Sequence, residues 1–269
     1  MGFFDDLADR IDSTDSVVSV GLDPDLDRLP EFLDGDLPRW QFNRRVIDAT
    51  HEHAACYKPN AAFYEDADGW RALEETIAYA HGKGVPVLLD AKRGDIGNTA
   101  RQYADLLADD GLGADAMTVN PYMGRDTLEP YLSMEDKGVI VLCRTSNEGG
   151  ADFQNLNVGN GKPLYEYVAQ RCEEWNDNDN VGLVVGATAP EELESVRNLV
   201  DLPFLVPGVG AQGGDAEAAV EYGLADGVGL VNSSRGIIFA GEGADTETEY
   251  FGAAGQSAKR LKKRLNKYR

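Results

Sequence analysis

The segment VPVLLDAKRGDIGNTA, residues 85–100, carries the pattern that decides the fold. It begins with a short apolar run, continues into a cluster of charged residues, and passes from Ile96 onward into a helix-like stretch. A short and almost continuously apolar run is typical of a strand covered on both faces, as in a parallel sheet. The segment therefore predicts one strand-then-helix unit with polar side chains at the end of the strand.

The same unit recurs along the whole chain. Apolar runs predict eight strands, at residues 16–22, 54–58, 85–90, 115–120, 138–143, 181–186, 204–207 and 227–231. Helix-like segments lie between several of them, at 71–81, 96–108, 164–175, 191–199 and 215–222. Eight such units, with polar or glycine-rich clusters after the strands, predict an α/β protein of the (β/α)8 TIM barrel class. We find no linker, so we expect a single domain over residues 1–269, with the long loop at 147–162 as a lid.

The charge balance narrows the possible partners. The chain has 47 acidic and 25 basic residues, a formal net charge of −22. Such a surface repels nucleic acids and anionic membranes, and it repels itself unless concentrated cations screen it. We therefore expect no nucleic-acid or membrane partner and a halophilic origin, with an ordinary acidic protein as the alternative. The basic last eleven residues are interpreted as the exposed face of a terminal helix with Leu261 and Leu265 on its buried side, rather than as an RNA or membrane contact.

The cysteines and the first residues bear on the compartment. Cys56, Cys143 and Cys172 are few, odd in number and widely spaced, which argues against a disulfide framework or a zinc site. No apolar run approaches the ~20 residues of a membrane-spanning helix, and the first residues lack a basic region followed by an apolar stretch. These features predict a cytoplasmic protein.

Three charged residues stand close together after the third predicted strand. Asp90 and Lys92 are two positions apart at the strand end, so they should point to the same face, which in a barrel is the interior. Asp95 lies just beyond them. The group is suited to placing charge beside a substrate, and the alternative is a structural ion pair with Asp95 as a helix N-cap.

The ends of the last two strands predict a phosphate site. The loop PGVGAQGGD at 207–215 has four glycines, which let backbone amides approach an anion, and a helix begins near its end. Arg235 follows the eighth strand, and barrel enzymes commonly bind phosphate with the loops after strands seven and eight. A plain turn and a surface arginine are the alternative.

Single polar residues follow other strands. Asp23 follows the first strand, Lys58 the second and Ser146 the fifth, and each alone is as much a structural as a functional candidate. The histidines lie in helical segments away from the strand ends and are interpreted as non-catalytic: His51, His53 and His81. No metal-binding motif is present.

With these residues placed, the chain resembles the orotidine 5′-monophosphate decarboxylase family over nearly its whole length. The family signature Asp-x-Lys-x-x-Asp, followed by Ile-Gly-x-Thr, is matched by Asp90, Lys92, Asp95, Ile96, Gly97 and Thr99. The phosphate loop, Arg235 and the segment CRTSN at 143–147 also match. Glu148 departs from the proline often found in CRTSNPG, which puts the local loop conformation in doubt.

The resemblance implies decarboxylation of orotidine 5′-monophosphate to uridine 5′-monophosphate in de novo pyrimidine biosynthesis, with no cofactor and no metal. It also implies a homodimer whose subunits share active sites. The roles implied are proton donation to C6 by Lys92 within a charged array with Asp90 and the partner's Asp95; ribose contacts from Asp23, Lys58 and the partner's Thr99; a pyrimidine contact from Ser146; and phosphate contacts from Gln212 and Arg235.

Two other functions are compatible with parts of the pattern. A keto-gulonate phosphate decarboxylase or hexulose phosphate synthase would use the same fold and a magnesium ion, but would lack the pyrimidine-binding serine and the glutamine of the phosphate loop. A non-catalytic sensor of a phosphorylated ligand would bind nucleotide without turnover. Turnover of orotidine phosphate that a chelator does not affect would separate the first interpretation from both.

Overall fold

A computed structural model describes the whole chain except residues 1, 34, 160, 188 and 210–213. The strands are β1 Val18–Leu22, β2 Cys56–Pro59, β3 Leu88–Arg93, β4 Ala116–Val119, β5 Gly138–Arg144, β6 Val181–Val185, β7 Phe204–Pro207 and β8 Leu230–Ser233. The α-helices are α1 Phe3–Thr14, α2 Pro38–Thr50, α3 Ala67–Gly82, α4 Gly97–Ala104, α5 Arg125–Leu132, α6 Ala151–Gln154, α7 Leu164–Glu174, α8 Pro190–Arg197, α9 Ala216–Glu221, α10 Arg235–Ile238 and α11 Glu247–Leu265. Short 3-10 turns are η1 Leu26–Arg28, η2 Ala61–Phe63, η3 Asp105–Leu107, η4 Pro121–Met123 and η5 Glu148–Gly150.

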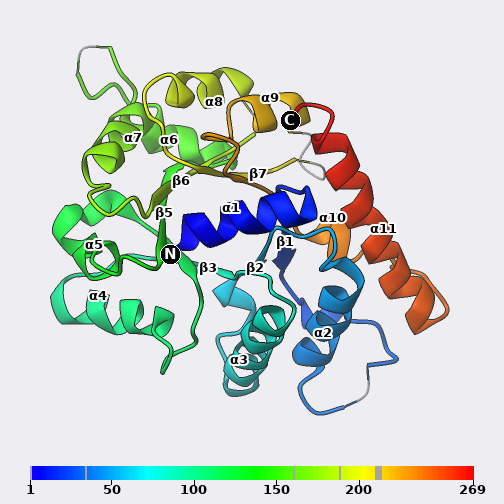
Figure 1. The fold of residues 1–269 in the computed structure, drawn as a ribbon. Coiled ribbons are helices and arrows are strands. Elements are labelled where there is room, and N and C mark those ends of the chain that lie inside the picture. The colour runs from blue at the N-terminus through cyan, green and yellow to red at the C-terminus, as the bar shows by residue number, and fades with distance from the viewer. Residues whose placement is uncertain (1, 34, 160, 188, 210–213) are drawn as a thin grey trace.

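The eight strands form one parallel sheet in the order β2-β1-β8-β7-β6-β5-β4-β3. Single bridges from Tyr57 to Val87 and from Asn60 to Asp90 bring its two edge strands together, so the sheet curls into a nearly closed barrel. Helices surround the strands (Figure 1). The predicted (β/α)8 architecture is confirmed.

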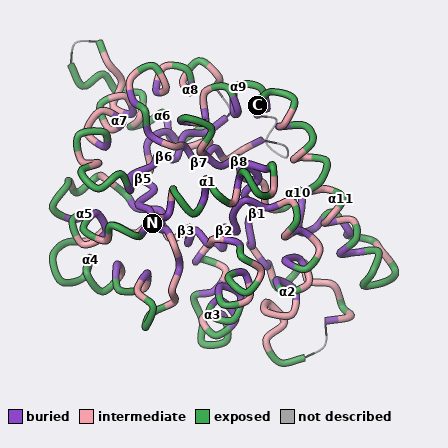
Figure 2. Tube along the Cα trace, viewed as in Figure 1, coloured by how far each residue is buried: buried purple, intermediate pink, exposed green. Residues whose placement is uncertain are grey.

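Burial explains why the strands were recognisable in the sequence. Most strand residues are buried, and the buried part of the chain in Figure 2 lies along the central strands. Because helices cover the outside and side chains fill the inside, β1 and β6 are buried at all five of their positions. The part of the chain that the structure describes contains no helix of the length and apolarity needed to cross a membrane.

Helix α1 covers the amino ends of the strands and was not predicted. It buries Phe3, Leu7 and Ile11, which are spaced four apart and so share one face. Its aromatic residues pack so closely on Gly138 and Gly182, in β5 and β6, that neither position has room for a Cβ atom. In Figure 1, α1 lies across the middle of the ring of strands. The helix therefore seals the end of the barrel opposite the polar loops.

Element boundaries depart from the predicted ones where the backbone is irregular. The third strand extends to Arg93 rather than ending at residue 90, and its register with β4 shifts between Leu89 and Arg93. The eighth strand begins at Leu230 rather than 227, because Gly227 and Gly229 have positive φ angles that interrupt an extended strand. The helix predicted at 96–108 is α4 followed by the 3-10 turn η3.

The predicted lid contains structure of its own. Residues 147–162 begin with η5 and α6, and the Gln154 side chain accepts a hydrogen bond from the Thr145 amide at 2.9 Å. This bond ties the start of the loop to the end of β5. Opening and closing of the loop stays a prediction.

Candidate active site

A cavity of about 190 Å³ opens at the carboxyl ends of the strands. It is lined by Asp23, Lys58, Asn60, Asp90, Pro207, Gly208, Val209, Asn232, Ser233, Ser234, Arg235 and Gly236. Asp90 lies within β3, and the other lining residues lie at or after the carboxyl ends of β1, β2, β7 and β8. Closure of the barrel thus brings together the predicted residues Asp23, Lys58, Asp90 and Arg235.

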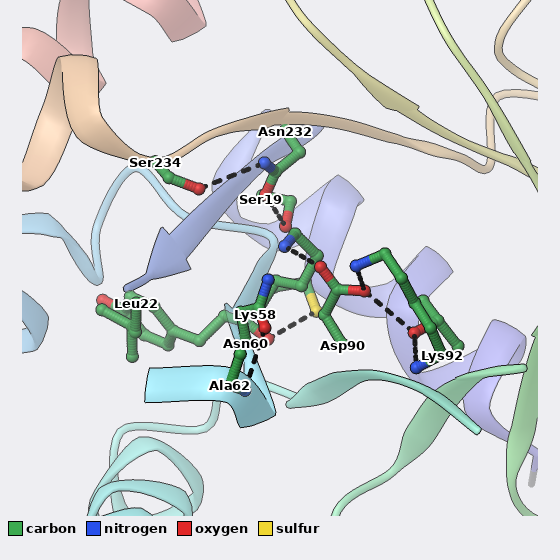
Figure 3. A network of polar contacts seen from close by, with 12 residues as sticks. Ser19, Leu22, Lys58, Asn60, Ala62, Asp90, Lys92, Asn232 and Ser234 are labelled. Carbon is green, nitrogen blue, oxygen red and sulfur yellow. Dashed lines mark hydrogen bonds and ion pairs between the residues drawn. The ribbon is translucent and has the colours of Figure 1, made fainter. Parts of the chain in front are cut away.

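Asp90 lies between two lysines. Its Oδ2 is 2.8 Å from Lys58 Nζ and its Oδ1 is 2.7 Å from Lys92 Nζ (Figure 3). Asp90 and Lys58 are 8% and 5% exposed, whereas 47% of the Lys92 side chain is exposed. The carboxylate is therefore held from both sides, by Lys58 from within the cavity wall and by Lys92 from a half-exposed position.

The ionisation of this buried pair is set by two opposing effects. Burial raises the pKa of Asp90. The charges and hydrogen bonds of Lys58 and Lys92 lower it by more than burial raises it, so the net shift is downward. Burial likewise lowers the pKa of Lys58, and the nearby Asp90 and Asp23 carboxylates raise it, with a net upward shift. Both groups are therefore charged at neutral pH.

The backbone at Lys92 is unusual. Its φ angle is +50°, in the left-handed region that residues other than glycine seldom adopt. Its amide donates to Thr118 Oγ1 at 2.9 Å, and the same hydroxyl donates to Asp90 Oδ1 at 2.9 Å. The side chains of Asp90 and Lys92 meet, as their spacing predicted, but through an irregular turn rather than a regular strand.

The residues that end and follow β8 bring a cation and polar side chains to the cavity. The exposed Arg235 follows β8, and Asn232 accepts a hydrogen bond from Ser19 Oγ at 3.2 Å (Figure 3). Ser234 packs so tightly on Gly21 that a Cβ atom there would overlap it. Of the predicted phosphate loop, Gly208 and Val209 line the cavity, while Gln212 lies outside the described residues.

One expectation about this loop is wrong. The helix after it, α9, was expected to offer its N-terminus to an anion. Instead the Asp215 side chain accepts hydrogen bonds from the amides of Glu217 and Ala218, at 2.8 and 3.3 Å. Because a carboxylate already occupies that end of the helix, its first amides are not free for phosphate.

A larger cavity, of about 800 Å³, lies beside the barrel between η4 and α7. Its walls are mainly apolar and aromatic, including Tyr122, Phe153 and Trp175, and Arg171 is its one charged lining residue among those described. A reaction in which negative charge develops needs charged groups held close to the reacting atoms. The larger cavity offers Arg171 alone, whereas Asp23, Lys58, Asp90 and Arg235 line the smaller one. The smaller cavity is therefore the candidate active site.

Comparison with known proteins identifies the family. The model of the orotidine 5′-phosphate decarboxylase / HUMPS family matches residues 16–250. The chain belongs to this family. An orotidine 5′-phosphate decarboxylase of Natronomonas pharaonis is 86% identical over the full length of both chains, and that of Halorubrum lacusprofundi is 74% identical, also over both full lengths. Both come from halophilic archaea, in agreement with the predicted origin.

Solved structures agree with the decarboxylase family assignment. The Leishmania donovani OMP decarboxylase superposes with a TM-score of 0.84 at 44% identity, covering 100% of this chain and 99% of the other. The UMP synthase of the same organism superposes with a TM-score of 0.85 at 45% identity, covering 100% of this chain and 56% of that longer one. The family name also includes HUMPS, but the two archaeal relatives and the Leishmania donovani OMP decarboxylase carry the decarboxylase name.

Four described residues of the decarboxylase motif set lie outside the cavity lining: Lys92, Asp95, Thr99 and Ser146. Lys92 is joined to the lining through its ion pair with Asp90. Asp95 Oδ1 accepts from the Ile96 amide at 2.8 Å, and the N-cap of α4 is Ile96, so Asp95 is not the helix cap considered as its structural role. Thr99 is exposed on α4. Ser146 lies against Gly186, just after β6.

Three polar residues of the site were not singled out from the sequence: Asn60, Thr118 and Asn232. Asn60 and Asn232 line the cavity, and Thr118 bonds to Asp90. The sequence signal for Thr118 was a polar residue within the apolar run AMTV, and the structure shows it to be fully buried. A buried polar side chain needs a hydrogen-bond partner, and the partner of Thr118 is the Asp90 carboxylate of the charged array.

Proposed function

We propose that this chain decarboxylates orotidine 5′-monophosphate to uridine 5′-monophosphate and CO2, with Lys92 as the proton donor to C6. The observation that carries the proposal is the Lys58–Asp90–Lys92 array: Lys58 and Asp90 line the same cavity as Arg235, and Lys92 is paired with Asp90 at 2.7 Å. A cation that is held by a buried carboxylate and reachable by a ligand is suited to stabilising negative charge that develops during a reaction.

The proposed chemistry uses protein side chains alone. The bond between C6 and the carboxylate breaks, CO2 leaves, and the electron pair stays on C6. The Lys92 ammonium stabilises this pair and then transfers a proton to it, forming the C6–H bond of the product. The neutral amine regains a proton from solvent, to which Lys92 is exposed. Asp90 keeps the ammonium in place throughout.

The other motif residues are assigned to binding. Arg235, together with Gln212, would hold the phosphate, and Ser146 would hydrogen-bond the pyrimidine. Asp23 and Lys58 would contact ribose hydroxyls. For Asp23 this is supported by its place in the cavity wall and by its buried Oδ1, which has no hydrogen-bond partner within the described residues. Binding energy from the phosphate can then be expressed in the transition state.

We also propose a homodimer with shared active sites, in which Asp95 and Thr99 act in the partner's cavity. Asp95 would sit near the departing carboxylate. In support, neither residue lines the cavity of its own chain. Apolar side chains after β3 and β4 are also unusually exposed: Ile96 is 63% and Tyr122 85% exposed. A contact between two copies at these loops would cover this apolar surface.

The chain is further proposed to act as one domain in the cytoplasm. One sheet contains all eight strands, which supports a single domain. Cys56, Cys143 and Cys172 are buried as free thiols, which supports a reducing compartment.

The test is Lys92→Ala, with Lys267→Ala as a matched control because Lys267 is an exposed lysine far along the chain in the tail. Turnover of orotidine 5′-monophosphate, followed by its ultraviolet absorbance in high salt, should fall by about 10⁴-fold or more in Lys92→Ala. Affinity for uridine 5′-monophosphate should largely remain. The control should match the wild type. Near-normal turnover in folded Lys92→Ala would refute the assigned role.

A further inference from the structure

Thr118 lies at the centre of the charged array without facing the cavity. Its side chain is fully buried in β4, where the neighbouring residues Met117 and Val119 are apolar. Its hydroxyl makes two hydrogen bonds of 2.9 Å, as donor to Asp90 Oδ1 and as acceptor from the Lys92 amide. One hydroxyl from a neighbouring strand thus contacts both ends of the Asp-x-Lys unit.

The hydrogen bond from the Lys92 amide to Thr118 acts on the Lys92 backbone. Lys92 has a left-handed φ angle of +50°, and the register between β3 and β4 is interrupted around it. Such a conformation persists only where the surroundings hold it. The bond from the Lys92 amide to Thr118 joins this irregular turn to the regular strand β4.

The hydrogen bond from Thr118 to Asp90 acts on the Asp90 carboxylate. Asp90 Oδ1 accepts from both Thr118 Oγ1 and Lys92 Nζ, while Oδ2 accepts from Lys58 Nζ. Because the Thr118 hydroxyl accepts from the amide, its own proton is directed to the carboxylate. The bond therefore fixes the rotation of the carboxylate on which the Lys92 ammonium rests.

We propose that Thr118 is a positioning residue for the decarboxylation, whose hydroxyl holds Asp90 and the backbone of Lys92 so that Lys92 Nζ is aimed at C6. The inference rests on the proposed function of Lys92. Thr118 does not line the cavity, so its effect is transmitted through the two residues that it holds. A loss of aim should therefore slow the chemical step and leave nucleotide binding intact.

The experiment compares Thr118→Val, which removes the hydroxyl at nearly constant volume, with Thr118→Ser, which keeps it. In Thr118→Val, kcat should fall about 10- to 100-fold, the order of effect expected from a small misplacement of a reacting group. Affinity for uridine 5′-monophosphate should stay within about threefold, because the groups that line the cavity are unchanged. Thr118→Ser should recover most of the rate.

Thr76→Val is the matched control. Thr76 is also fully buried, and its hydroxyl bonds to the Ala72 carbonyl and the Asn43 amide, away from the cavity. Thr76→Val reports the general effect of losing a buried hydroxyl, so the kcat of this variant should equal that of the wild type. If Thr118→Val does not fold, Thr118→Ala replaces it in the comparison with Thr118→Ser.

The positioning role is overturned by an unchanged kcat in the folded hydroxyl-free variant, by an equal loss in Thr118→Ser, or by a parallel loss of nucleotide affinity. Lys92→Ala, measured in the same assays, separates the two proposals. An inactive Lys92→Ala beside a fully active Thr118→Val would reject only the role of Thr118. An active Lys92→Ala would reject the role of Lys92, on which the positioning role of Thr118 rests.

Discussion

Asp90 binds two lysines at once, and water reaches the two contacts to different extents. The Lys58 side chain is 6% exposed and the Lys92 side chain 47%. A buried ion pair loses much of its value when one partner is removed, because the other charge stays buried without compensation. The Lys58–Asp90 contact therefore matters to stability, whereas Lys92 is open enough to serve a ligand.

Replacing Asp90 by Asn tests this distinction. Asp90→Asn should lower the free energy of unfolding by about 3–5 kcal/mol near neutral pH, because Lys58 is left as a buried cation. The same measurement on Asp68→Asn, whose exposed partner Arg71 is 3.5 Å away, should show a change within about 0.5 kcal/mol. Urea unfolding at constant salt measures both.

The pH dependence follows from the lowered pKa of Asp90. A carboxyl whose folded pKa is depressed stabilises the native state above its unfolded pKa of about 3.9, and that contribution is lost as the pH falls toward the folded value. The stability difference between the wild type and Asp90→Asn should thus be constant above pH ~5 and narrow below pH ~4. A difference that widens on acidification would contradict the downward shift.

At the scale of elements, helices α1 and α11 meet at their ends. Lys262 Nζ donates to the Thr14 carbonyl at 2.5 Å, and the Asn266 amide group donates to the Asp15 carbonyl at 2.8 Å. Leu265 is fully buried and Leu261 packs partly buried against the core. The predicted buried side of the terminal helix is therefore confirmed. Part of the basic tail serves to dock this helix on the barrel.

Leu265→Ala should cost about 2–5 kcal/mol of stability, since it removes buried methyl groups and leaves a cavity. Lys263→Ala, two positions earlier and exposed, is the matched control and should stay within about 0.5 kcal/mol. The kcat of both folded variants should be unchanged, because α11 lies outside the cavity lining. Equal stability of the two variants would show that the helix end is not docked.

At the scale of the whole molecule, the net charge of −22 makes surface carboxylates repel one another and so destabilises the folded chain. Screening lengths fall from about 10 Å at 0.1 M salt to about 3 Å at 1 M, so repulsion between surface carboxylates weakens steeply over this range. The melting temperature should rise by about 5 °C or more between 0.1 and 2 M potassium chloride. Sucrose, which is uncharged, serves as the control for general exclusion effects. Full stability in dilute buffer would remove the halophile argument.

The proposed dimer predicts that two inactive variants regain activity when they are mixed. Mixed Lys92→Ala and Asp95→Ala proteins form hybrid dimers with one intact site, because that site takes its Lys92 from one subunit and its Asp95 from the other. With random exchange, about one quarter of wild-type activity should return. Subunit exchange is verified with a tag on one variant. Absence of recovery after verified exchange would count against shared sites.

Much of the architecture could be read from local pattern. Short apolar runs marked all eight strands, and several runs were almost continuous, since burial on both faces leaves no polar alternation along a strand. The placing of Asp23, Lys58, Asp90 and Arg235 in one cavity also followed, because parallel strands end at the same face of a barrel. The excess of acidic over basic residues predicted the halophilic origin. These properties depend on composition or on neighbours in the chain.

Other features depend on contacts between residues far apart in the sequence, and only the tertiary structure decided them. Thr118 reaches Asp90 and Lys92 because β4 lies beside an irregular β3. The packing of α1 on the barrel floor likewise follows from matching shapes at Gly138 and Gly182. Register and side-chain packing are set by closure of the barrel, which no local window of residues contains.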